Sequence, residues 1–574
     1  MGPTSLSSLP TPSWPGRDAD HLLVTAQQMQ DLEAELFASG LPVEALMEKA
    51  SLAMARRLLS LATPAPSASA PWSVAMQPMA PEQEPELEPA ELARLGAALR
   101  ERGAVVLVGP GHNGGDGLVL ARELQLAGLE VRLWCPFERR KPLTERHWSH
   151  ARWLGIPELP LPPDPHEGCL WIDALFGNGQ RRAPGDALES LLEQRQQRQG
   201  GLLVALDVPT GLCSDTGKLL GSAAATASLT LCLGLIRQGL VQDSALAWVG
   251  RLERIDLGLS AQLLTALPLE QPLALGGRGC GQADALRAPR PLPPPAAGKY
   301  GRGRLLVIAG SERYPGAGLL ALHGASASGC GSLRASLAAA HDPGLSALLP
   351  HVVPEPQPFA SGALTRLDAL LIGPGLGAGT GPARAPGQVG DNQAAARAMD
   401  GEADGLLNAQ AWQELLHFAG TLVIDADGLN RISADWLCER VGSTWITPHA
   451  AEFARLFADL AGLPPLEAAS SAARRCGIAV VLKGAHSVVA APDGRRWQVV
   501  HSCAASARAG LGDVLAGYAA GLASRAAACF QPDPALLALA ALDHARAACR
   551  AIRHHGEGGA TPLAVAQELQ RARG

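Results

Sequence analysis

Short apolar runs alternate with longer amphipathic stretches along most of the chain. Each run is almost wholly apolar, which is typical of a strand buried on both faces of a parallel sheet. Helical periodicity appears between the runs, for example at Asp116–Ala127 and Glu452–Asp459. The alternation predicts an α/β protein with two doubly wound domains, each an open sheet with helices on both faces. The expected strands are Ala104–Val108, Val131–Trp134, Leu170–Ile172 and Leu202–Leu206, then Arg304–Ala309, Ala369–Ile372, Leu422–Ile424, Thr444–Ile446 and Ala479–Leu482.

Three segments interrupt this alternation. The Pro/Ser/Ala-rich stretch 62–89 is poor in large apolar residues and is expected to be a mobile insertion. The Gly/Ala-rich stretch 378–404 predicts a surface loop. The stretch 277–297 predicts a stiff linker between a first domain over 1–276 and a second over 298–574. Its prolines include Pro289, Pro291, Pro293, Pro294 and Pro295.

Composition narrows the class of protein. A length of 574 residues suggests two to four domains, and 47% hydrophobic against 18% charged residues suffices for large cores. The net charge of −6, without a basic block, argues against a nucleic-acid partner. No apolar stretch is long enough to span a bilayer, and the start of the chain lacks an export signal. Eleven cysteines are scattered without close pairs, which predicts neither a zinc site nor a disulfide framework and indicates a reducing, cytoplasmic location.

The turn after the first expected strand is rich in glycine. Gly109, Gly111 and Gly114 match the dinucleotide fingerprint GxGxxG, but the end of the next strand, Trp134–Phe137, lacks the required acid. An ordinary Rossmann dehydrogenase is therefore disfavoured. The denser core Asn113–Gly117 suits a phosphate or carboxylate held by backbone amides at a helix N-terminus. A simple helix cap is the alternative.

Two further strands of the first half end in carboxylates. Asp173 stands at the end of one strand, shortly before Gly177, and Asp207 stands at the end of the next, shortly before Thr210. One aspartate at a strand end often does no more than cap a loop. Here the carboxyl ends of parallel strands share one sheet edge, so Asp173 and Asp207 are expected to converge with Asn113. The result is a ring of hard oxygen donors around one crevice.

The motifs NGGDG, DALFG and DVPTG, in this order, resemble the NAD(P)H-hydrate epimerase family, also called the YjeF N-terminal domain, over about residues 20–265. The resemblance implies a domain with a Rossmann-like fold. It would interconvert the R and S epimers of hydrated NADH and hydrated NADPH, which are called NADHX and NADPHX. The resemblance also implies K⁺ held by Asn113, Asp173 and Thr210. The implied substrate-binding residues are His112, Asn113, Gly114, Gly115, Asp116, Gly177, Asn178, Gly179, Gln180, Arg181, Arg182, Ala183 and Asp207.

The chain departs from that family at three places. The family usually has Asn at position 112 and Ser at 210, where this chain has His112 and Thr210. Members also carry a Lys soon after the strand that ends here at Trp134, whereas this chain has the segment Phe137–Lys141. The identity of the epimerase base is therefore left open.

The second half carries its own set of strand-end motifs. DADGLN begins at Asp425, TPHAAEF contains His449, and VLKGA places Lys483 at the end of a strand. In the turn Gly510–Asp513 the glycines open a helix whose free N–H groups can hold a transferring phosphoryl group. Asp513 then lies where it can take a proton from an attacking hydroxyl, unless the turn is only a helix cap.

GPGLG, DADGLN, TPHAAEF, VLKGA and GLGDVLAG together resemble the ADP/ATP-dependent NAD(P)H-hydrate dehydratase family, over about residues 290–570. That family has a ribokinase-like fold. The resemblance implies Asp513 as catalytic residue, Gly375, His449 and Asp513 as contacts to the hydrated nicotinamide, and Mg²⁺ bound with ADP. The implied nucleotide-binding residues are Lys483, Gly484, Ala485, His486, Ser487 and Gly512.

Both halves in one chain resemble the bacterial bifunctional NAD(P)H-hydrate repair enzymes. Such a chain epimerises NAD(P)HX and dehydrates the S epimer to NAD(P)H, with ADP giving AMP and phosphate. The alternative is a ribokinase-like kinase for a small molecule, fused to a non-catalytic YjeF-type binding module. The expected partners are small molecules, without nucleic acid or membrane. Homo-oligomerisation, the preference for ADP or ATP, the preference for NADHX or NADPHX, and communication between the sites stay open.

Overall fold

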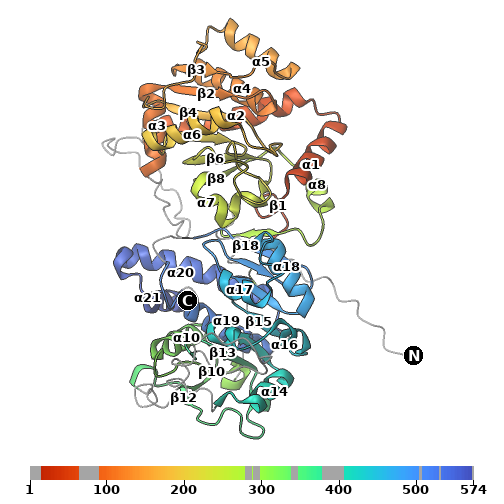
Figure 1. Ribbon diagram of the computed structural model, residues 1–574, viewed down its shortest axis with the longest axis vertical. Coiled ribbons are helices and arrows are strands. Elements are labelled where there is room, and N and C mark those ends of the chain that lie inside the picture. The colour runs from red at the N-terminus through yellow and green to blue at the C-terminus, as the bar shows by residue number, and fades with distance from the viewer. Residues whose placement is uncertain are drawn as a thin grey trace, which may run out of the picture. The chain divides into compact units, whose positions relative to one another are not determined.

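The computed structural model describes residues 14–63, 90–277, 288, 298–337, 347–377, 406–502, 507–528 and 532–571. The expected insertion 62–89, linker 277–297 and loop 378–404 therefore lie almost wholly outside the described residues. Contacts divide the chain into two compact units, Asp18–Leu267 and a second unit made of Met1–Arg17 with Pro268–Gly574 (Figure 1). The two α/β domains expected from the sequence are thus confirmed.

The first unit is built on a parallel sheet with strand order β3-β2-β4-β5-β6-β8, and β1 pairs separately with β7. The order reverses direction between β2 and β4, as in doubly wound sheets. The four strands expected here from apolar runs agree with observed strands to within two residues. The strands are β1 (Leu23–Val24), β2 (Ala104–Val108), β3 (Val131–Trp134), β4 (Leu170–Ala174), β5 (Leu203–Leu206), β6 (Leu229–Leu233), β7 (Ile236–Arg237) and β8 (Arg251–Ile255).

Helices cover both faces of this sheet. Val106 of β2 packs in one core with residues of α2, α3, α4 and α5. Its neighbours Val105 and Leu107 point to the other face, where they pack with residues of α6. The helices are α1 (Ala26–Ala38), α2 (Val43–Ala62), α3 (Ala90–Arg102), α4 (His112–Leu126), α5 (Pro142–Trp153), α6 (Asp186–Gln199), η1 (Gln238–Val241), η2 (Asp243–Ala245), α7 (Leu246–Val249) and α8 (Ala261–Ala266).

The second unit has a larger sheet with strand order β12-β11-β10-β13-β14-β15-β16-β17-β18-β9. It is parallel from β12 to β16, while β17 runs antiparallel to both of its neighbours. The strands are β9 (Leu273–Leu275), β10 (Arg304–Ile308), β11 (Ser332–Ser336), β12 (Val353–Pro354), β13 (Ala369–Ile372), β14 (Thr421–Ile424), β15 (Thr444–Ile446), β16 (Ala479–Leu482), β17 (Val488–Ala490) and β18 (Arg496–Val499).

Helices again lie on both faces. One core joins β10, β13 and β14 to α14, α16, α17 and α18. On the other face α19 packs against α10, β13 and β14, and α20 packs against α19. The helices are η3 (Lys299–Arg302), α10 (Pro315–Ala327), η5 (Leu364–Arg366), α14 (Ala409–His417), α15 (Ala426–Asn430), α16 (Ala434–Glu439), α17 (Ala450–Leu456), α18 (Pro465–Cys476), α19 (Leu511–Ala527), α20 (Ala535–Gly559) and α21 (Pro562–Arg571).

The structure places the change of domain earlier than the predicted linker. Strand β9, in the segment assigned from sequence to the first domain, pairs in parallel with β18 at the edge of the second sheet. Segment 14–17 also belongs to the second unit, where Trp497 Nε1 donates to the Trp14 carbonyl at 3.1 Å. Arg17 donates to the Pro268 carbonyl at 2.8 Å. The edge of β18 needs a backbone partner, and β9 supplies it.

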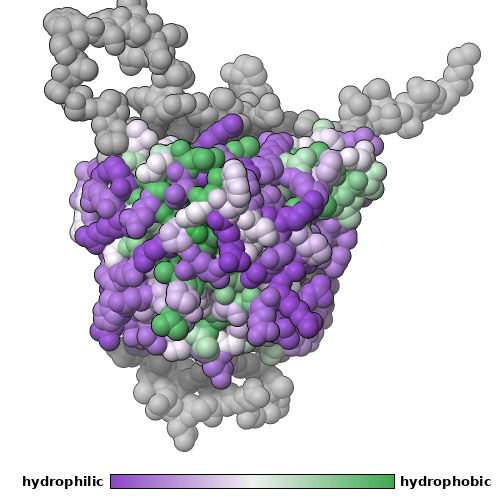
Figure 2. Space-filling model, turned by 90° about the horizontal axis from the view of Figure 1, so that it is seen from above, coloured by the Kyte–Doolittle hydropathy of each residue, from purple (hydrophilic) through white to green (hydrophobic). Residues whose placement is uncertain are grey.

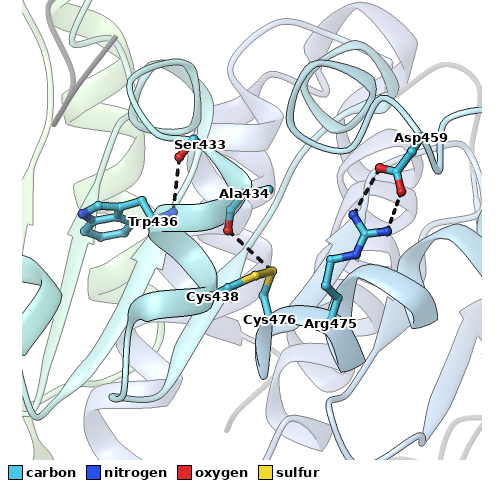
Figure 3. The surroundings of a disulfide bond; sticks show 7 residues. All are labelled: Ser433, Ala434, Trp436, Cys438, Asp459, Arg475 and Cys476. Carbon is cyan, nitrogen blue, oxygen red and sulfur yellow. Dashed lines mark hydrogen bonds and ion pairs between the residues drawn. A yellow bond between two sulfur atoms is a disulfide. The ribbon is translucent and has the colours of Figure 1, made fainter. Parts of the chain in front are cut away.

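One cysteine pair contradicts the expectation that the chain has no disulfide. Cys438 of α16 is bonded to Cys476, the last residue of α18 (Figure 3). The two residues are 38 positions apart, so their spacing gave no signal, and only the packing of α16 against α18 brings them together. The free cysteines of the described residues are Cys135, Cys169, Cys213, Cys232, Cys330 and Cys549.

Within the described residues no helix is long and apolar enough to cross a membrane. Figure 2 shows one face of the molecule, on which hydrophilic residues predominate and apolar residues gather in smaller patches between them. Scattered apolar side chains of this kind are ordinary on a protein surface.

The position of β9 predicts how the chain can be cut. A fragment of residues 268–574 should be more stable than one of residues 289–574, because the shorter fragment loses the buried Leu273 and Leu275. Full burial of one leucine contributes about 1.5–3 kcal/mol, so the difference in the free energy of unfolding should be roughly 3–6 kcal/mol. Urea unfolding of both fragments measures it. Equal unfolding midpoints would mean that β9 is dispensable for the second domain.

Candidate active sites

A cavity of about 450 Å³ opens at the carboxyl ends of β2, β4 and β5 in the first unit. It lies where the strand order reverses, which is the usual ligand position in doubly wound sheets. Eight of the residues expected from sequence to bind substrate line it, together with residues from α1 and from the segment before α5. The lining is Gln30, Glu33, Pro110, Gly111, His112, Asn113, Asp116, Lys141, Leu175, Phe176, Gly177, Asn178, Gly179, Gln180, Asp207 and Leu233.

The glycines of the NGGDG turn mainly allow protein segments to pack closely. A Cβ on Gly114 would lie 2.0 Å from the Gly109 carbonyl oxygen, and a Cβ on Gly109 would lie 1.7 Å from that of Leu175. A Cβ on Gly115 would lie 2.7 Å from Met47 Cε. Gly114 and Gly115 therefore face the protein, and neither lines the cavity, whereas His112 and Asn113 do.

Asp173, in β4, is buried and held by the exit of the neighbouring strand. Its Oδ1 accepts a hydrogen bond from Thr210 Oγ1 at 2.8 Å, and its Oδ2 accepts one from the Thr210 backbone N–H at 2.8 Å. The Leu175 N–H donates a third at 3.2 Å. Burial raises the pKa of Asp173 to about 6, against these hydrogen bonds, which lower it. The carboxylate thus has donors but no cationic side chain among its described partners.

Asn113 adds a second oxygen that needs a partner. It is 9% exposed, and its Nδ2 donates to the Leu206 carbonyl at 3.3 Å. Its buried Oδ1 has no hydrogen-bond partner within the described residues. A buried amide oxygen and a buried carboxylate with neutral donors fit a hard cation such as K⁺, which binds oxygen ligands.

Asp207 directly follows β5 and has a positive φ of 65°. Its Oδ2 accepts from the Asn178 N–H at 2.7 Å and its Oδ1 from the Leu233 N–H at 3.3 Å. Arg237 forms an ion pair with the same carboxylate. Arg237 is 1% exposed, and burial lowers its pKa to about 10. Asp207 therefore fixes the turn that begins at Gly177, and Arg237 in turn holds Asp207 in place.

The rest of that turn divides into a fixed and an exposed part. Gln180 Oε1 accepts from the Gly211 N–H at 2.7 Å, and its Nε2 donates to the Pro209 carbonyl at 3.0 Å. The amide thereby ties the turn to the DVPTG loop. The next three residues, expected from sequence to bind substrate, are exposed and lie outside the cavity lining: Arg181, Arg182 and Ala183.

Sequence reasoning missed four residues of this site. Gln30 and Glu33 come from α1, where polar residues three apart look like an ordinary solvent face. Lys141 is the last residue of the segment that stands where the family has its lysine, and it does line the cavity. Burial and then the charge of Lys141 lower the pKa of His112. Arg237, the fourth, had no local motif that pointed to it.

In the second unit a buried ion pair lies at the carboxyl ends of β14, β15 and β16. Asp425 Oδ1 accepts from Lys483 Nζ at 2.7 Å and from Thr447 Oγ1 at 2.8 Å. Asp425 is 1% exposed, and its Oδ2 has no partner within the described residues. Burial lowers the pKa of Lys483, but Asp425 and Glu452 outweigh it and the net shift is upward. Lys483 is therefore held charged.

His449 caps α17. Its Nδ1 accepts from the N–H groups of Ala451 and Glu452, at 3.1 and 3.3 Å, while Glu452 Oε2 accepts from the His449 N–H at 2.8 Å. This capping box leaves Nε2 as the ring nitrogen that carries the proton when the ring is neutral. The side chain is 54% exposed, so it is open to a ligand.

Asp513 lies in the first turn of α19, beside Lys483. A Cβ on Gly512 would lie 3.3 Å from Lys483 Nζ, so the ammonium sits against the helix N-terminus. Burial and then the charge of Asp425 raise the pKa of Asp513 to about 7. Asp427 and Glu452 raise it by smaller amounts, and the opposing effect of Lys483 does not cancel these contributions. A cation, free backbone N–H groups and a carboxyl group near neutrality thus meet at one point.

His544 of α20 is a further residue that sequence reasoning missed. Its ring hydrogen-bonds to the backbone at Leu511, in the turn that opens α19, and burial lowers its pKa to about 4. Its Nε2 has no partner within the described residues. A histidine within a long amphipathic helix gives no sequence signal of this kind, because its partner lies more than thirty positions away.

The glycines expected to contact substrate and nucleotide have packing roles as well. Gly375 has φ of 67°, and a Cβ there would lie 2.7 Å from that of Ala317. In the turn after Lys483 the Ser487 hydroxyl accepts from the Gly484 N–H at 3.3 Å and donates to the Gly484 carbonyl at 3.2 Å. The turn is therefore preformed. The structure brings Lys483, Gly512 and Asp513 together, whereas it leaves the expected roles of Gly375 and the other turn residues as predictions.

A cavity of about 470 Å³ also exists at the opposite end of this sheet, lined by residues such as Leu367 and Gly420 that precede β13 and β14. It contains none of the residues expected from sequence. The chemistry argued above lies at the carboxyl ends of the strands, so the larger cavity is not taken as the active site.

Known proteins match both units. The model of the family described as NAD(P)H-hydrate dehydratase matches residues 305–571, and that of the YjeF-related protein N-terminus matches residues 43–239. The chain is 39% identical to the bifunctional NAD(P)H-hydrate repair enzyme Nnr of Gloeobacter violaceus, over 90% of this chain and 91% of that protein. It is 35% identical to the enzyme of the same name from Synechocystis, over 87% and 85%. An ADP/ATP-dependent NAD(P)H-hydrate dehydratase from Bacillus subtilis is 25% identical, with a TM-score of 0.37 over 49% of this chain and 93% of that one.

Proposed function

The chain belongs to the family of bifunctional NAD(P)H-hydrate repair enzymes, and on that premise we propose how its two sites divide the repair. The first unit is the epimerase domain and the second is the dehydratase domain. A dehydratase that accepts one epimer needs an epimerase to reach the other, so both domains in one chain can return the whole hydrate pool to NAD(P)H. The kinase alternative does not account for relatives that match over both domains.

For the epimerase site we assign K⁺ to Asn113, Asp173 and Thr210. The partnerless Asn113 Oδ1 and the buried Asp173 carboxylate support this assignment. The ion would supply positive charge that orients the substrate phosphates. The chain's own residues bind those phosphates through the first turn of α4 and the turn that begins at Gly177, while Asp207 keeps that turn in place.

For the dehydratase site the observation that carries the assignment is the contact of Lys483 with the first turn of α19. The ammonium and the free N–H groups bind the terminal phosphoryl group of ADP, and Asp513 takes the proton from the C6 hydroxyl of the S epimer. The hydroxyl oxygen attacks phosphorus and AMP leaves. Loss of phosphate from C6 and of a proton from C5 then restores the ring double bond, because phosphate is a far better leaving group than hydroxide.

Mg²⁺ fits this site as a companion of the nucleotide. Within the described residues no three acidic, cysteine or histidine side chains form a metal-binding group. Mg²⁺ commonly uses one or two carboxylates with substrate phosphates and water, and it supplies charge to the transferring phosphoryl group. We further propose ADP as the donor, a cytoplasmic location, and small molecules as the partners, without nucleic acid or membrane.

Replacing Asp513 tests its role as the base. Asp513→Asn should lower ADP-dependent recovery of NADH from the S epimer by roughly 10²–10⁴-fold, with epimerisation unchanged, because a positioned base is lost. NADH absorbance measures dehydration. Asp435→Asn, an exposed acid on α16, is the matched control and should behave like the parent. Near-normal turnover in folded Asp513→Asn would remove it as the base.

The pH dependence of dehydration follows from the same group. A base with a pKa of about 7 is active only when ionised, so kcat/KM should fall about tenfold per pH unit below pH 7 and level off above it. The groups facing it are Asp425, Asp427 and Glu452, which raise its pKa, and Lys483, which lowers it. In Lys483→Gln, the fall of the remaining kcat/KM on the acid side should therefore begin at a higher pH than in the parent. A pH-independent kcat/KM from pH 5 to 9 would contradict the assignment.

The potassium assignment has its own test. Asn113→Ala removes one proposed oxygen ligand, so the K⁺ concentration that half-saturates epimerisation should rise at least about tenfold. Dehydration of pure S epimer should stay unchanged, because Asn113 lies in the other unit. Titrating KCl against epimerisation, at constant ionic strength, measures the effect. A parent protein that shows no response to K⁺ would show that the ion site is wrongly assigned.

A further inference from the structure

Two carboxyl groups face the epimerase cavity from different helices. Glu33 comes from α1 and Asp116 from the first turn and a half of α4, and both line the cavity. Asp207, the other acid of the lining, is already bound by Arg237 and by two backbone N–H groups. Glu33 and Asp116 are therefore the acidic groups of this lining that can exchange protons with a substrate.

The fold holds α1 firmly against the cavity. Thr25 caps the helix in a reciprocal capping box with Gln28. The Ala26 N–H donates to Asp215 Oδ1 at 2.6 Å, and the Ala26 carbonyl accepts from Asn178 Nδ2 at 3.0 Å. Since Asn178 belongs to the cavity turn, the start of α1 is tied to the substrate site, and Glu33 lies on this helix in the cavity lining.

Asp116 is almost fully buried. It is 7% exposed, and the Ser51 hydroxyl donates to its Oδ1 at 3.4 Å. Burial raises its pKa well above the ordinary value, and the negative charge of Glu33 raises it further. Both carboxyl groups line the same cavity, so a substrate bound there can meet both of them.

The surrounding charges differ between the two groups. Burial raises the pKa of Glu33, but the Arg237 cation lowers it. No cation lowers the pKa of Asp116. Burial thus favours the protonated form of Asp116, while Arg237 opposes the same effect of burial at Glu33. The other titratable groups of the cavity are His112, Lys141 and Asp207.

The Asn113 oxygen proposed above to bind K⁺ lies in the same cavity. Asn113 Oδ1, on a side chain that is more than nine-tenths buried, lines it without a partner in the described part of the chain. A partnerless buried oxygen costs free energy unless a ligand satisfies it.

We propose that Asp116 and Glu33 are the acid and base of epimerisation, an inference that rests on the epimerase function proposed above. Asp116 gives its proton to the C6 hydroxyl, the C6–O bond breaks, and water leaves a cyclic iminium ion with a double bond between N1 and C6. Glu33 takes a proton from a water molecule whose oxygen bonds to C6 from the opposite face. No net proton is consumed, and the proton now on Glu33 returns to Asp116 through solvent. Inverting glycosidases likewise use one carboxyl group as acid and a second as base toward water.

The test uses full-length variants and separated R and S NADHX. Glu33→Gln and Asp116→Asn should each slow epimerisation by roughly 10²–10⁴-fold. Glu35→Gln, an exposed carboxylate on the same helix, is the matched control and should match the parent. Glu33→Asp keeps the carboxylate and should recover part of the rate. Chromatography of the two epimers measures the rate, and thermal unfolding with S-epimer dehydration reports whether each variant is folded.

Two further readouts separate a catalytic role from a structural one. The parent should show a bell-shaped pH profile for epimerisation, and each single variant should keep only one limb, because one titrating group is left. In heavy-oxygen water the parent should introduce one labelled oxygen at C6 with each inversion.

Several outcomes would overturn the inference. Folded Glu33→Gln or Asp116→Asn that epimerises at the parent rate would remove that residue from the pair. Inversion by the parent without uptake of labelled oxygen would exclude departure of water. A parent that dehydrates the S epimer but never interconverts the two epimers would instead contradict the proposed epimerase function itself.

Discussion

Each domain depends on a buried aspartate that binds the exit of the neighbouring strand. In the first, Asp173 accepts from the hydroxyl and the N–H of Thr210. In the second, Asp425 accepts from the hydroxyl of Thr447 and from Lys483. Removing a carboxylate from water costs several kcal/mol unless hydrogen bonds and charges replace the lost hydration. This cost is comparable with the whole free energy of unfolding of a domain. These bonds therefore set where the loops around each site lie.

The two aspartates differ in one respect that separates the chemistry of the sites. Asp425 has a cationic partner, and in binding it Asp425 holds the Lys483 ammonium against the first turn of α19, where phosphoryl charge can be stabilised. Asp173 has neutral donors alone among its described partners, so no side-chain cation balances its charge there. In our proposal, the same arrangement of a buried aspartate and a neighbouring loop supports phosphoryl transfer in one sheet and potassium binding in the other.

Much of the fold follows from local pattern. Runs such as Ala104–Val108 and Ala479–Leu482 form strands with the predicted bounds, because fully buried parallel strands must be apolar throughout. Strands of mixed character were missed. Strand β8, with sequence RLERI, is half exposed, and β9 is only three residues long. The first domain was predicted to end at residue 276, beyond β9, because nothing near Leu273 in the sequence indicates that its partner strand lies beyond residue 490.

The sequence by itself determined the family, the alternation of elements, and the polar residues that follow each strand, such as Asp207 and Asp513. These are local properties, because a motif and the strand before it are adjacent in the chain. Only the tertiary structure decided that Glu33 and Asp116 line one cavity, that Arg237 holds Asp207, that Cys438 bonds Cys476, and that His544 reaches the turn before α19. Each of these contacts joins residues from different helices or strands. Packing of whole elements, rather than any short motif, sets their distances and the electrostatic environment of each group.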